Sequence, residues 1–335
     1  MWEIPLFNEK KIVIPYPKGP DPDVNYILGG LKHIPHYSVT VIPNGRFWGG
    51  LGGAVIGKDN RVFKELSHEV PQASCCPPIF KTTSLPKMEN KNIAILHCFF
   101  GFNYYHWMFD VAARLDLIRK SHIPIDMYVT SCAFPFQDEI LTHLGVPLEK
   151  RITITPYLYI QANQLVVPSF IHSYTGTIPE WAVHFLREEL LVKRNVKKRV
   201  GYERIYISRA HASHRKITNE EEVVNLLQKH GFKRVFLEDE SVAGKIELFH
   251  SANVILSSHG AGLTNLLFCN SGTKIVELFS PGWIFPCYRM ISFYLGLDYY
   301  CLTGEGTYSY RVDLRKASDD ITVNIGGLSK LLESL

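Results

Sequence analysis

The stretch Asn253–Glu277, NVILSSHGAGLTNLLFCNSGTKIVE, sets the expectation for the fold. Its apolar residues 254–256 predict a short strand that runs into two serines and a glycine-containing turn at 259–262. A helix start at 263–265 and a second apolar run at 274–279 complete a strand–turn–helix–strand unit. Such a unit directs backbone N–H groups and the positive end of a helix dipole at an anion, most often a phosphate.

Six residues of this turn form the first candidate site. They are His259, Gly260, Ala261 and Gly262 in the turn, and Thr264 and Asn265 at the start of the helix. Glycine lets the backbone approach a ligand closely, and it permits a positive φ. Glycine-rich turns also serve packing alone, so the turn by itself leaves both roles open.

The sequence on both sides of the turn repeats the alternation of strand and helix. Strands are predicted at 204–208, 234–237, 254–256 and 275–279, and helices at 223–230, 241–251 and 286–294. Repeated βαβ units predict a parallel sheet with its binding edge at the carboxyl ends of the strands. Arg209 and Arg215 follow one strand end, where they are expected to neutralise a diphosphate. Glu277 lies near another strand end, where it is expected to accept hydrogen bonds from ribose hydroxyls.

A second candidate site lies on the amphipathic helix predicted for residues 104–120. Asn103 is suited to cap the amino end of this helix. His106 and Asp110 are four residues apart and therefore project from one helical face. A histidine on such a face is often a core residue with its polar atoms satisfied, which is the alternative to a role in catalysis.

The predicted fold class is α/β with three parts. Residues 1–195 form an acceptor-side domain that is β-rich over 1–90 and α/β over 91–195, residues 196–320 form a nucleotide-binding domain, and residues 321–335 form a terminal helix. The basic residues 197–199 mark the expected boundary and are read as a solvated linker. Candidate site residues occur in both residues 1–195 and residues 196–320, so the sequence predicts a binding cleft between two domains.

Composition excludes several classes of protein. A net charge of +4 is too small to indicate nucleic-acid binding. The seven cysteines show no C-x-x-C spacing, so neither a zinc site nor a redox dithiol is expected, and a reducing compartment is favoured. No stretch resembles a signal peptide or a membrane span, which predicts a cytoplasmic protein. The motif of P-loop enzymes is absent, and no G-x-G-x-x-G with a suitably placed acidic residue supports nicotinamide binding.

Three motifs resemble glycosyltransferase family 61. They are NYYHWMFD at 103–110, the arginine-bearing segment from YISR at 206–209 to RKITNE at 215–220, and HGAGLTN at 259–265. The motifs occur in the order that the family shows, and the resemblance extends over roughly residues 40–285.

This resemblance implies a GT-B fold with two Rossmann-like domains and an inverting mechanism without a divalent metal or other cofactor. It implies a nucleotide-sugar donor, often UDP-xylose or UDP-N-acetylglucosamine, and a glycan or glycoconjugate acceptor. Asp110 or His106 would be the general base, and these two are not ranked because histidine titrates nearer neutrality while the family motif contains both. The turn and the arginines would stabilise the leaving diphosphate.

The similarity to bacterial members implies a role in surface or capsular polysaccharide synthesis, in the cytoplasm or peripherally at the inner face of the membrane. Two alternatives stay open on the sequence. One is another transferase with a GT-B-like scaffold, such as a pyruvyl transferase, and the other is a non-catalytic module that binds nucleotide sugars. The donor sugar, the acceptor and the oligomeric state are not predicted.

Overall fold

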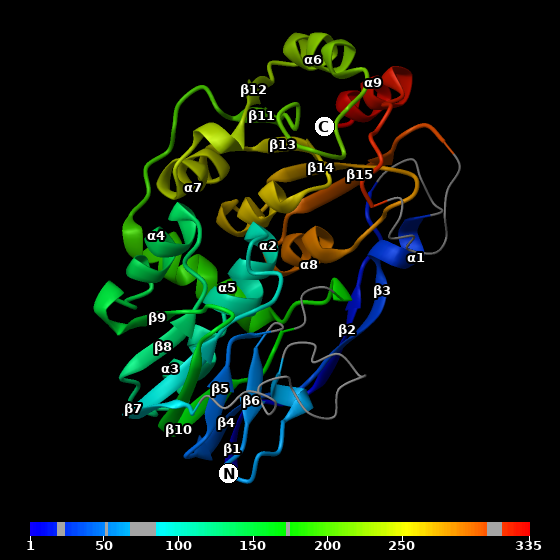
Figure 1. Cartoon of the computed structure of the whole chain (residues 1–335). Helices are drawn as coiled ribbons and strands as arrows, with labels where there is room; N and C mark the ends of the chain where they lie inside the picture. The colour runs from blue at the N-terminus through cyan, green and yellow to red at the C-terminus, as the bar shows by residue number, and fades with distance from the viewer. Residues whose placement is uncertain (19–23, 51–52, 68–84, 172–174, 307–316) are drawn as a thin grey trace. The chain divides into compact units, whose positions relative to one another are not determined.

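The computed structural model describes residues 1–18, 24–50, 53–67, 85–171, 175–306 and 317–335 (Figure 1). The chain has a mixed α/β fold, as the sequence predicted, with several sheets and helices. It divides into two compact units. The first contains Met1–Lys10, Ile34–Thr175 and His184–Leu190, and the second contains Lys11–His33, Gly176–Val183 and Leu191–Leu335. The domain limits at 195 and 320 stay a prediction.

The first unit contains an eight-stranded mixed sheet. Its strands are β1 (Trp2–Phe7), β4 (Tyr37–Pro43), β5 (Arg46–Trp48), β6 (Ala54–Ile56), β7 (Lys87–Leu96), β8 (Met127–Thr130), β9 (Arg151–Thr153) and β10 (Tyr159–Pro168). The main order is β1-β4-β10-β7-β8-β9, and β5 pairs with both β10 and β6. Neighbouring strands are parallel in the part of the sheet ordered β10-β7-β8-β9. Helical segments connect β7 to β8 and β8 to β9, as parallel neighbours require.

The β-rich character predicted for residues 1–90 is confirmed where the structure describes that stretch. A hairpin was predicted between Phe47 and Phe63 with a polar turn at 58–61, and it is present as the antiparallel bridge between Ile56 and Val62. Strands β5 and β6 form a further antiparallel pair, and residues 51–52 between them lie outside the described part. Residues 68–84, which include the adjacent Cys75 and Cys76, also lie outside it. Strands β2 (Lys10–Ile14) and β3 (Gly30–Ile34) pair only with each other, and the short helix α1 (Asn25–Leu28) precedes β3.

The helix predicted at residues 104–120 is present, but it is not one regular α-helix. It consists of α2 (Tyr104–Trp107), a π-helical turn η5 (Met108–Ala112) and α3 (Leu115–Lys120). The backbone N–H of Ala113 donates to the carbonyl of Met108 at 2.9 Å, which is the i to i+5 bond of a π-helical turn. Such turns occur often at functional sites, and this one contains Asp110. The next helix, α4 (Pro135–His143), leads to η6 (Leu148–Lys150) and β9.

The second unit contains a five-stranded sheet in which all neighbouring strands are parallel, as predicted. Its strands are β11 (Arg204–Ile207), β12 (Lys233–Val235), β13 (Val254–Ser258), β14 (Lys274–Phe279) and β15 (Asp298–Thr303). Their spatial order is β12-β11-β13-β14-β15, a doubly wound arrangement in which the winding direction reverses between β11 and β13. Ligands bind at the carboxyl ends of the strands at such a reversal.

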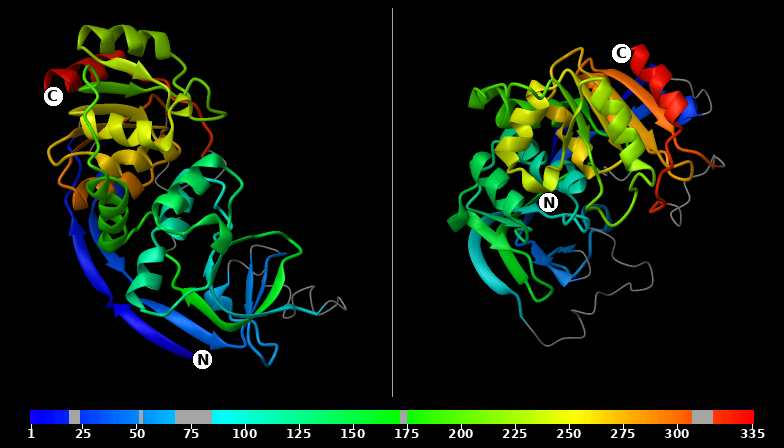
Figure 2. Two further views of the ribbon diagram at one scale, coloured as in Figure 1. Left: turned by 90° about the vertical axis from the view of Figure 1, so that its left-hand side faces the viewer. Right: turned by 90° about the horizontal axis from the view of Figure 1, so that it is seen from above.

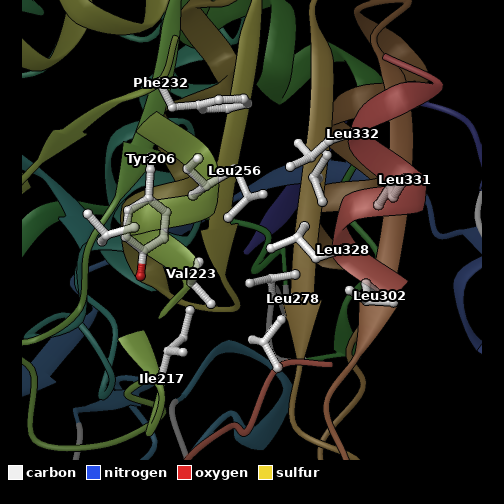
Figure 3. Close-up of a cluster of buried hydrophobic side chains, with 14 of the residues drawn as sticks. Tyr206, Ile217, Val223, Phe232, Leu256, Leu278, Leu302, Leu328, Leu331 and Leu332 are labelled. Carbon is white, nitrogen blue, oxygen red and sulfur yellow. The ribbon is translucent and has the colours of Figure 1, made fainter. Parts of the chain in front are cut away.

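Helices cover both faces of this sheet (Figure 2). They are α6 (Glu220–Lys229), α7 (Val242–Ser251), η10 (Ala261–Phe268), α8 (Cys287–Tyr294) and α9 (Ile325–Glu333). The α6 and α9 helices contact each other and pack on one face, where their leucines and valines meet Leu256, Leu278 and Leu302 of the strands (Figure 3). Each fully buried leucine contributes about 2 kcal/mol relative to an exposed one. The terminal helix therefore packs on the second unit, a placement that the sequence left open.

Four further helical elements are described. They are α5 (Glu180–Leu190), η3 (Lys64–Leu66), η8 (Val192–Arg194) and η9 (Leu237–Asp239). Among the helices in the part of the chain that the structure describes, none has both the length and the apolar character needed to cross a bilayer.

Candidate functional site

The helical face in the first unit brings together the residues that the sequence selected. The side-chain oxygen of Asn103 accepts a hydrogen bond from the backbone N–H of Tyr105 at 2.9 Å, which makes Asn103 the predicted N-cap. Nδ1 of His106 lies 3.5 Å from Oδ2 of Asp110. The His106 side chain is 19% exposed and that of Asp110 is 3% exposed, so a substrate hydroxyl would reach the histidine more readily. The ring of Phe100 lies 5.3 Å from that of His106 and restricts its movement.

Arg114 is a buried residue of this face that the sequence analysis missed. Its Nε donates to the carbonyl of Ser169 at 3.0 Å, Nη1 donates to those of His97 and Asp110 at 3.1 Å each, and Nη2 donates to that of Pro168 at 2.5 Å. Burial lowers the pKa of Arg114 to about 10, so the guanidinium stays charged at neutral pH. Arg114 thus ties the π-helical turn to the ends of β7 and β10. The spacing of four residues between His106, Asp110 and Arg114 was the signal that could have identified it.

The Arg114→Lys variant should lower the free energy of unfolding by about 2 kcal/mol, because an ammonium group cannot reproduce four hydrogen bonds directed by a planar guanidinium. Urea unfolding followed by circular dichroism measures this change. The matched control is Arg119→Lys on the same helical segment. Arg119 is 39% exposed and forms an ion pair with Glu189, so this control should cost less than about 1 kcal/mol. Equal losses in the two variants would contradict the role assigned to Arg114.

In the second unit, Arg209 and Gly260 meet at the reversal point of the sheet. Arg209 lies just beyond the end of β11, and Gly260 lies just beyond the end of β13. A Cβ atom placed on Gly260 would lie only 2.1 Å from Nη1 of Arg209, so the guanidinium occupies the space of a side chain. The φ of Gly260 is 179°, which is extended backbone, and Gly262 is also outside the positive-φ region. Neither glycine uses the positive φ that its residue type permits, and close packing is the reason for glycine at position 260.

The turn leads into a 3-10 helix, η10, rather than an α-helix. Ala261 and Gly262 are partly exposed at its amino end, so their backbone groups are accessible to a ligand. Thr264 and Asn265 are fully buried, and the amide nitrogen of Asn265 donates to the carbonyl of Gly262 at 2.9 Å. The structure therefore places these two side chains inside the turn, where they shape it, rather than on its accessible surface.

Arg209 and Arg215 lie near each other, and in the described part of the chain neither forms an ion pair with a carboxylate. Arg209 Nη2 donates to the carbonyl of His214 at 3.1 Å, and the backbone carbonyl of Arg215 accepts from Ser258 at 3.1 Å. Burial lowers the pKa of both arginines, and the charge of Arg215 lowers that of Arg209 further. Among the described residues neither arginine pairs with a carboxylate, and the buried Nε of each has no hydrogen-bond partner there. Two neighbouring, partly buried cations without a carboxylate at ion-pair distance in the described residues favour an anionic ligand.

Glu277 lies near the carboxyl end of β14, as the sequence analysis expected, but its carboxylate is not open to a ligand. It is fully buried, its Oε1 lies 2.5 Å from Nδ1 of His259, and its Oε2 accepts a hydrogen bond from the Tyr299 hydroxyl at 2.5 Å. Both oxygens are occupied within the protein, so the predicted contact between Glu277 and ribose hydroxyls does not fit this geometry. The sequence showed that Glu277 is near a strand end, but not that Tyr299 on β15 and His259 would surround it.

His259 is buried beside the arginines. Burial lowers its pKa, and the carboxylate of Glu277 opposes this effect. The aromatic rings of Phe279 and Tyr288 lie 5.4 and 5.1 Å from the imidazole ring. Within the described ranges, no three histidine, cysteine, aspartate or glutamate side chains lie close enough together to hold a metal ion.

The chain is similar to known glycosyltransferases. The sequence model described as Glycosyltransferase 61 matches residues 104–276, slightly more than half of the chain. A beta-1,2-xylosyltransferase of Oryza sativa subsp. japonica is 28% identical over 82 residues, which cover 24% of this chain and 15% of that protein. The protein O-linked-mannose beta-1,4-N-acetylglucosaminyltransferase 2 of Bos taurus is 30% identical over 178 residues, 50% of this chain and 29% of that protein. The enzyme of that name from Mus musculus is 31% identical over 169 residues, 47% of this chain and 27% of that protein.

The chain thus spans less than a third of the length of these relatives. The matched family region begins at the helix that carries His106 and Asp110, and it ends next to Glu277. It therefore includes His106, Asp110, both arginines and the turn at 259–265, while Asn103 and Glu277 lie directly outside it.

Proposed function

Since this chain belongs to the glycosyltransferase 61 family, we propose that it transfers a sugar from a UDP-sugar to a glycan or glycoconjugate hydroxyl, with inversion and without a metal ion. The observation that carries the nucleotide part of this proposal is the pair Arg209 and Arg215 at the reversal point of the parallel sheet. These cations are partly buried, the buried Nε of each has no hydrogen-bond partner among the described residues, and a diphosphate would supply negative charge beside them. The GT-B layout is part of the same proposal.

The second unit would hold the donor. The guanidinium of Arg209 packed on Gly260, together with Arg215 and the backbone N–H groups of Ala261 and Gly262, would contact the diphosphate. Positive charge at this point stabilises negative charge on the leaving UDP, a role that a divalent metal fills in other transferases. The side chains of Thr264 and Asn265 would maintain the turn.

The first unit would supply the base. Asp110 or His106 removes the proton of the acceptor hydroxyl, and the resulting nucleophilic oxygen attacks the anomeric carbon of the donor. The bond between that carbon and the phosphate oxygen breaks, and UDP leaves with its electron pair. The contact of 3.5 Å between the two side chains allows either residue to take the proton and the other to orient it.

The names of the relatives support an inverting reaction. All three specify a β linkage in the product, and two sugars, xylose and N-acetylglucosamine, are transferred. The UDP donors of these sugars carry an α linkage, so a single displacement with inversion would yield the β product. UDP-xylose and UDP-N-acetylglucosamine are accordingly our first choices of donor. These relatives are eukaryotic, so the role in bacterial capsule synthesis and the cytoplasmic location remain predictions from the sequence.

The test measures UDP release from each of the two donors by the purified protein, with and without EDTA. We expect release from one donor at a rate that EDTA leaves unchanged, and a large loss in His106→Ala. Strict dependence on added Mg²⁺ or Mn²⁺ would contradict the metal-independent mechanism. Thermal shift with UDP and with phosphoenolpyruvate separates the alternatives, since a pyruvyl transferase would respond to the second compound. Binding of UDP without turnover of any donor would identify a non-catalytic module.

A further inference from the structure

Three buried side chains on neighbouring strands form a continuous hydrogen-bonded series in the second unit. Tyr299 of β15 donates to Oε2 of Glu277 on β14 at 2.5 Å, and Oε1 of Glu277 lies 2.5 Å from Nδ1 of His259, just beyond β13. Tyr299 and Glu277 are almost completely inaccessible, and His259 is only 5% exposed. The series therefore leads from the interior of the sheet to the turn at Gly260.

The series fixes which nitrogen of His259 remains for a ligand. A carboxylate accepts hydrogen bonds, so its two oxygens take the Tyr299 O–H and the His259 Nδ1–H. Among the described residues, His259 has no other hydrogen-bond partner, which leaves Nε2 for a ligand. The rings of Phe279 and Tyr288 pack against the imidazole, with centroids 5.4 and 5.1 Å from it.

The charges around His259 change its protonation when an anion binds. Burial lowers its pKa, the nearby Arg215 and Arg209 lower it further, and Glu277 alone raises it. Burial also raises the pKa of Tyr288 and of Tyr299 well above the usual value, so both tyrosines stay neutral. The free site therefore favours a neutral imidazole at physiological pH. A bound diphosphate adds negative charge beside the ring and favours the imidazolium, which can donate from Nε2 to a phosphate oxygen.

We propose that Glu277 and Tyr299 are positioning residues that hold His259 so that it takes up a proton and binds the diphosphate of a nucleotide through Nε2. This inference rests on the proposed function, because it assumes that the ligand at this turn is a nucleoside diphosphate. It assigns Glu277 a role inside the protein in place of a contact with ribose. It also gives a function to Tyr299, whose strand lies beyond the matched family region.

The test is calorimetric titration of UDP into the protein between about pH 5.5 and pH 8.5. Because binding takes up a proton, UDP should bind more weakly as the pH rises through the interval between the pKa of His259 in the free and bound protein. The loss should approach about tenfold per pH unit there. Titrations in buffers with different heats of ionisation measure the proton uptake directly. The terminal phosphate of UDP also titrates near pH 6, and this contribution is common to all variants.

His259→Gln should abolish the protein's share of the proton uptake. Glu277→Gln keeps the size of the side chain but removes the charge that favours the imidazolium. It should weaken UDP binding by about 10- to 50-fold at neutral pH and move the pH dependence to lower pH. Tyr299→Phe removes one hydrogen bond to Glu277, and we expect a smaller loss of about 3- to 10-fold.

Tyr206→Phe is the matched control for Tyr299→Phe. Tyr206 is also buried in this sheet and donates to a glutamate, Glu220, at 2.7 Å, but this pair does not reach His259. Both variants should lose similar thermal stability, whereas only Tyr299→Phe should weaken UDP binding. If wild-type protein binds UDP and Glu277→Gln retains the same pH dependence and proton uptake, this inference is wrong while the nucleotide site stands. If wild-type protein fails to bind UDP at any pH, the proposed nucleotide site and the inference are both overturned.

Discussion

Asp110→Asn should lower the rate of sugar transfer by about a thousandfold while leaving the affinity for UDP unchanged. General-base catalysis contributes about 10²- to 10⁴-fold, and an amide cannot accept the proton of the acceptor hydroxyl. The substitution preserves the size of a side chain that is only 3% exposed, so the π-helical turn should keep its shape. The residues proposed to hold the donor belong to the second unit, and UDP titration should therefore give the wild-type dissociation constant. Single-turnover transfer with saturating donor measures the rate.

Asp116→Asn is the matched control for this prediction. Asp116 is also a buried aspartate of the same helical segment, where it forms an ion pair with Lys120. Its replacement should reduce stability but should leave the transfer rate within about threefold of wild type. If Asp110→Asn keeps its activity and His106→Ala loses it, His106 is the base. Full activity in both variants would exclude this helical face from the chemistry.

The periodic elements of the fold were predictable because their signals are local. Alternating strand and helix patterns after residue 203 predicted a parallel sheet, and the structure confirms it. The same patterns predicted the helix at 104–120 but not its π-helical turn. Arg114 stabilises that turn through carbonyl groups at His97, Pro168 and Ser169, and these positions are far from it in the sequence.

Long-range pairing explains the other differences. Residues 11–33 belong to the second compact unit, where the backbone of Lys18 pairs with β15 next to Tyr299 and Cys301. No local pattern encodes this pairing. Glu277 illustrates the same limit within the candidate site. Its position at a strand end was visible in the sequence, but the burial of its carboxylate depends on Tyr299, in a strand that the sequence analysis did not predict.

Position 260 shows a further limit of the sequence. The turn left both ligand approach and packing open as roles of its glycines, whereas the structure shows extended backbone at Gly260 and a guanidinium in the space of a side chain. A packing requirement between residues that are 51 positions apart cannot be read from a turn motif. It can, however, be tested by adding a single methyl group.

Gly260→Ala should weaken UDP binding by about 100-fold. The new Cβ would lie 2.1 Å from Nη1 and 2.7 Å from Cζ of Arg209, so the guanidinium has to leave its position. An arginine–phosphate contact is a charge-assisted hydrogen bond worth about 1.5–3 kcal/mol, and losing it corresponds to roughly 10- to 150-fold in affinity. Gly326→Ala is the control, because the nearest atom to its added Cβ is Asn324 Oδ1 at 3.5 Å, an ordinary contact. This control should bind UDP like wild type.

A double-mutant cycle shows whether the methyl group at position 260 acts through Arg209. In wild type, Gly260→Ala displaces a guanidinium that we propose contacts the diphosphate. In an Arg209→Ala background that guanidinium is already absent, so the added methyl group should change UDP affinity by less than about threefold. The interaction energy between the two sites should then nearly equal the effect of Gly260→Ala alone. Full additivity of the two losses would mean that the alanine disturbs the turn itself, and Arg209 would lose its assignment as the group that requires glycine at this position.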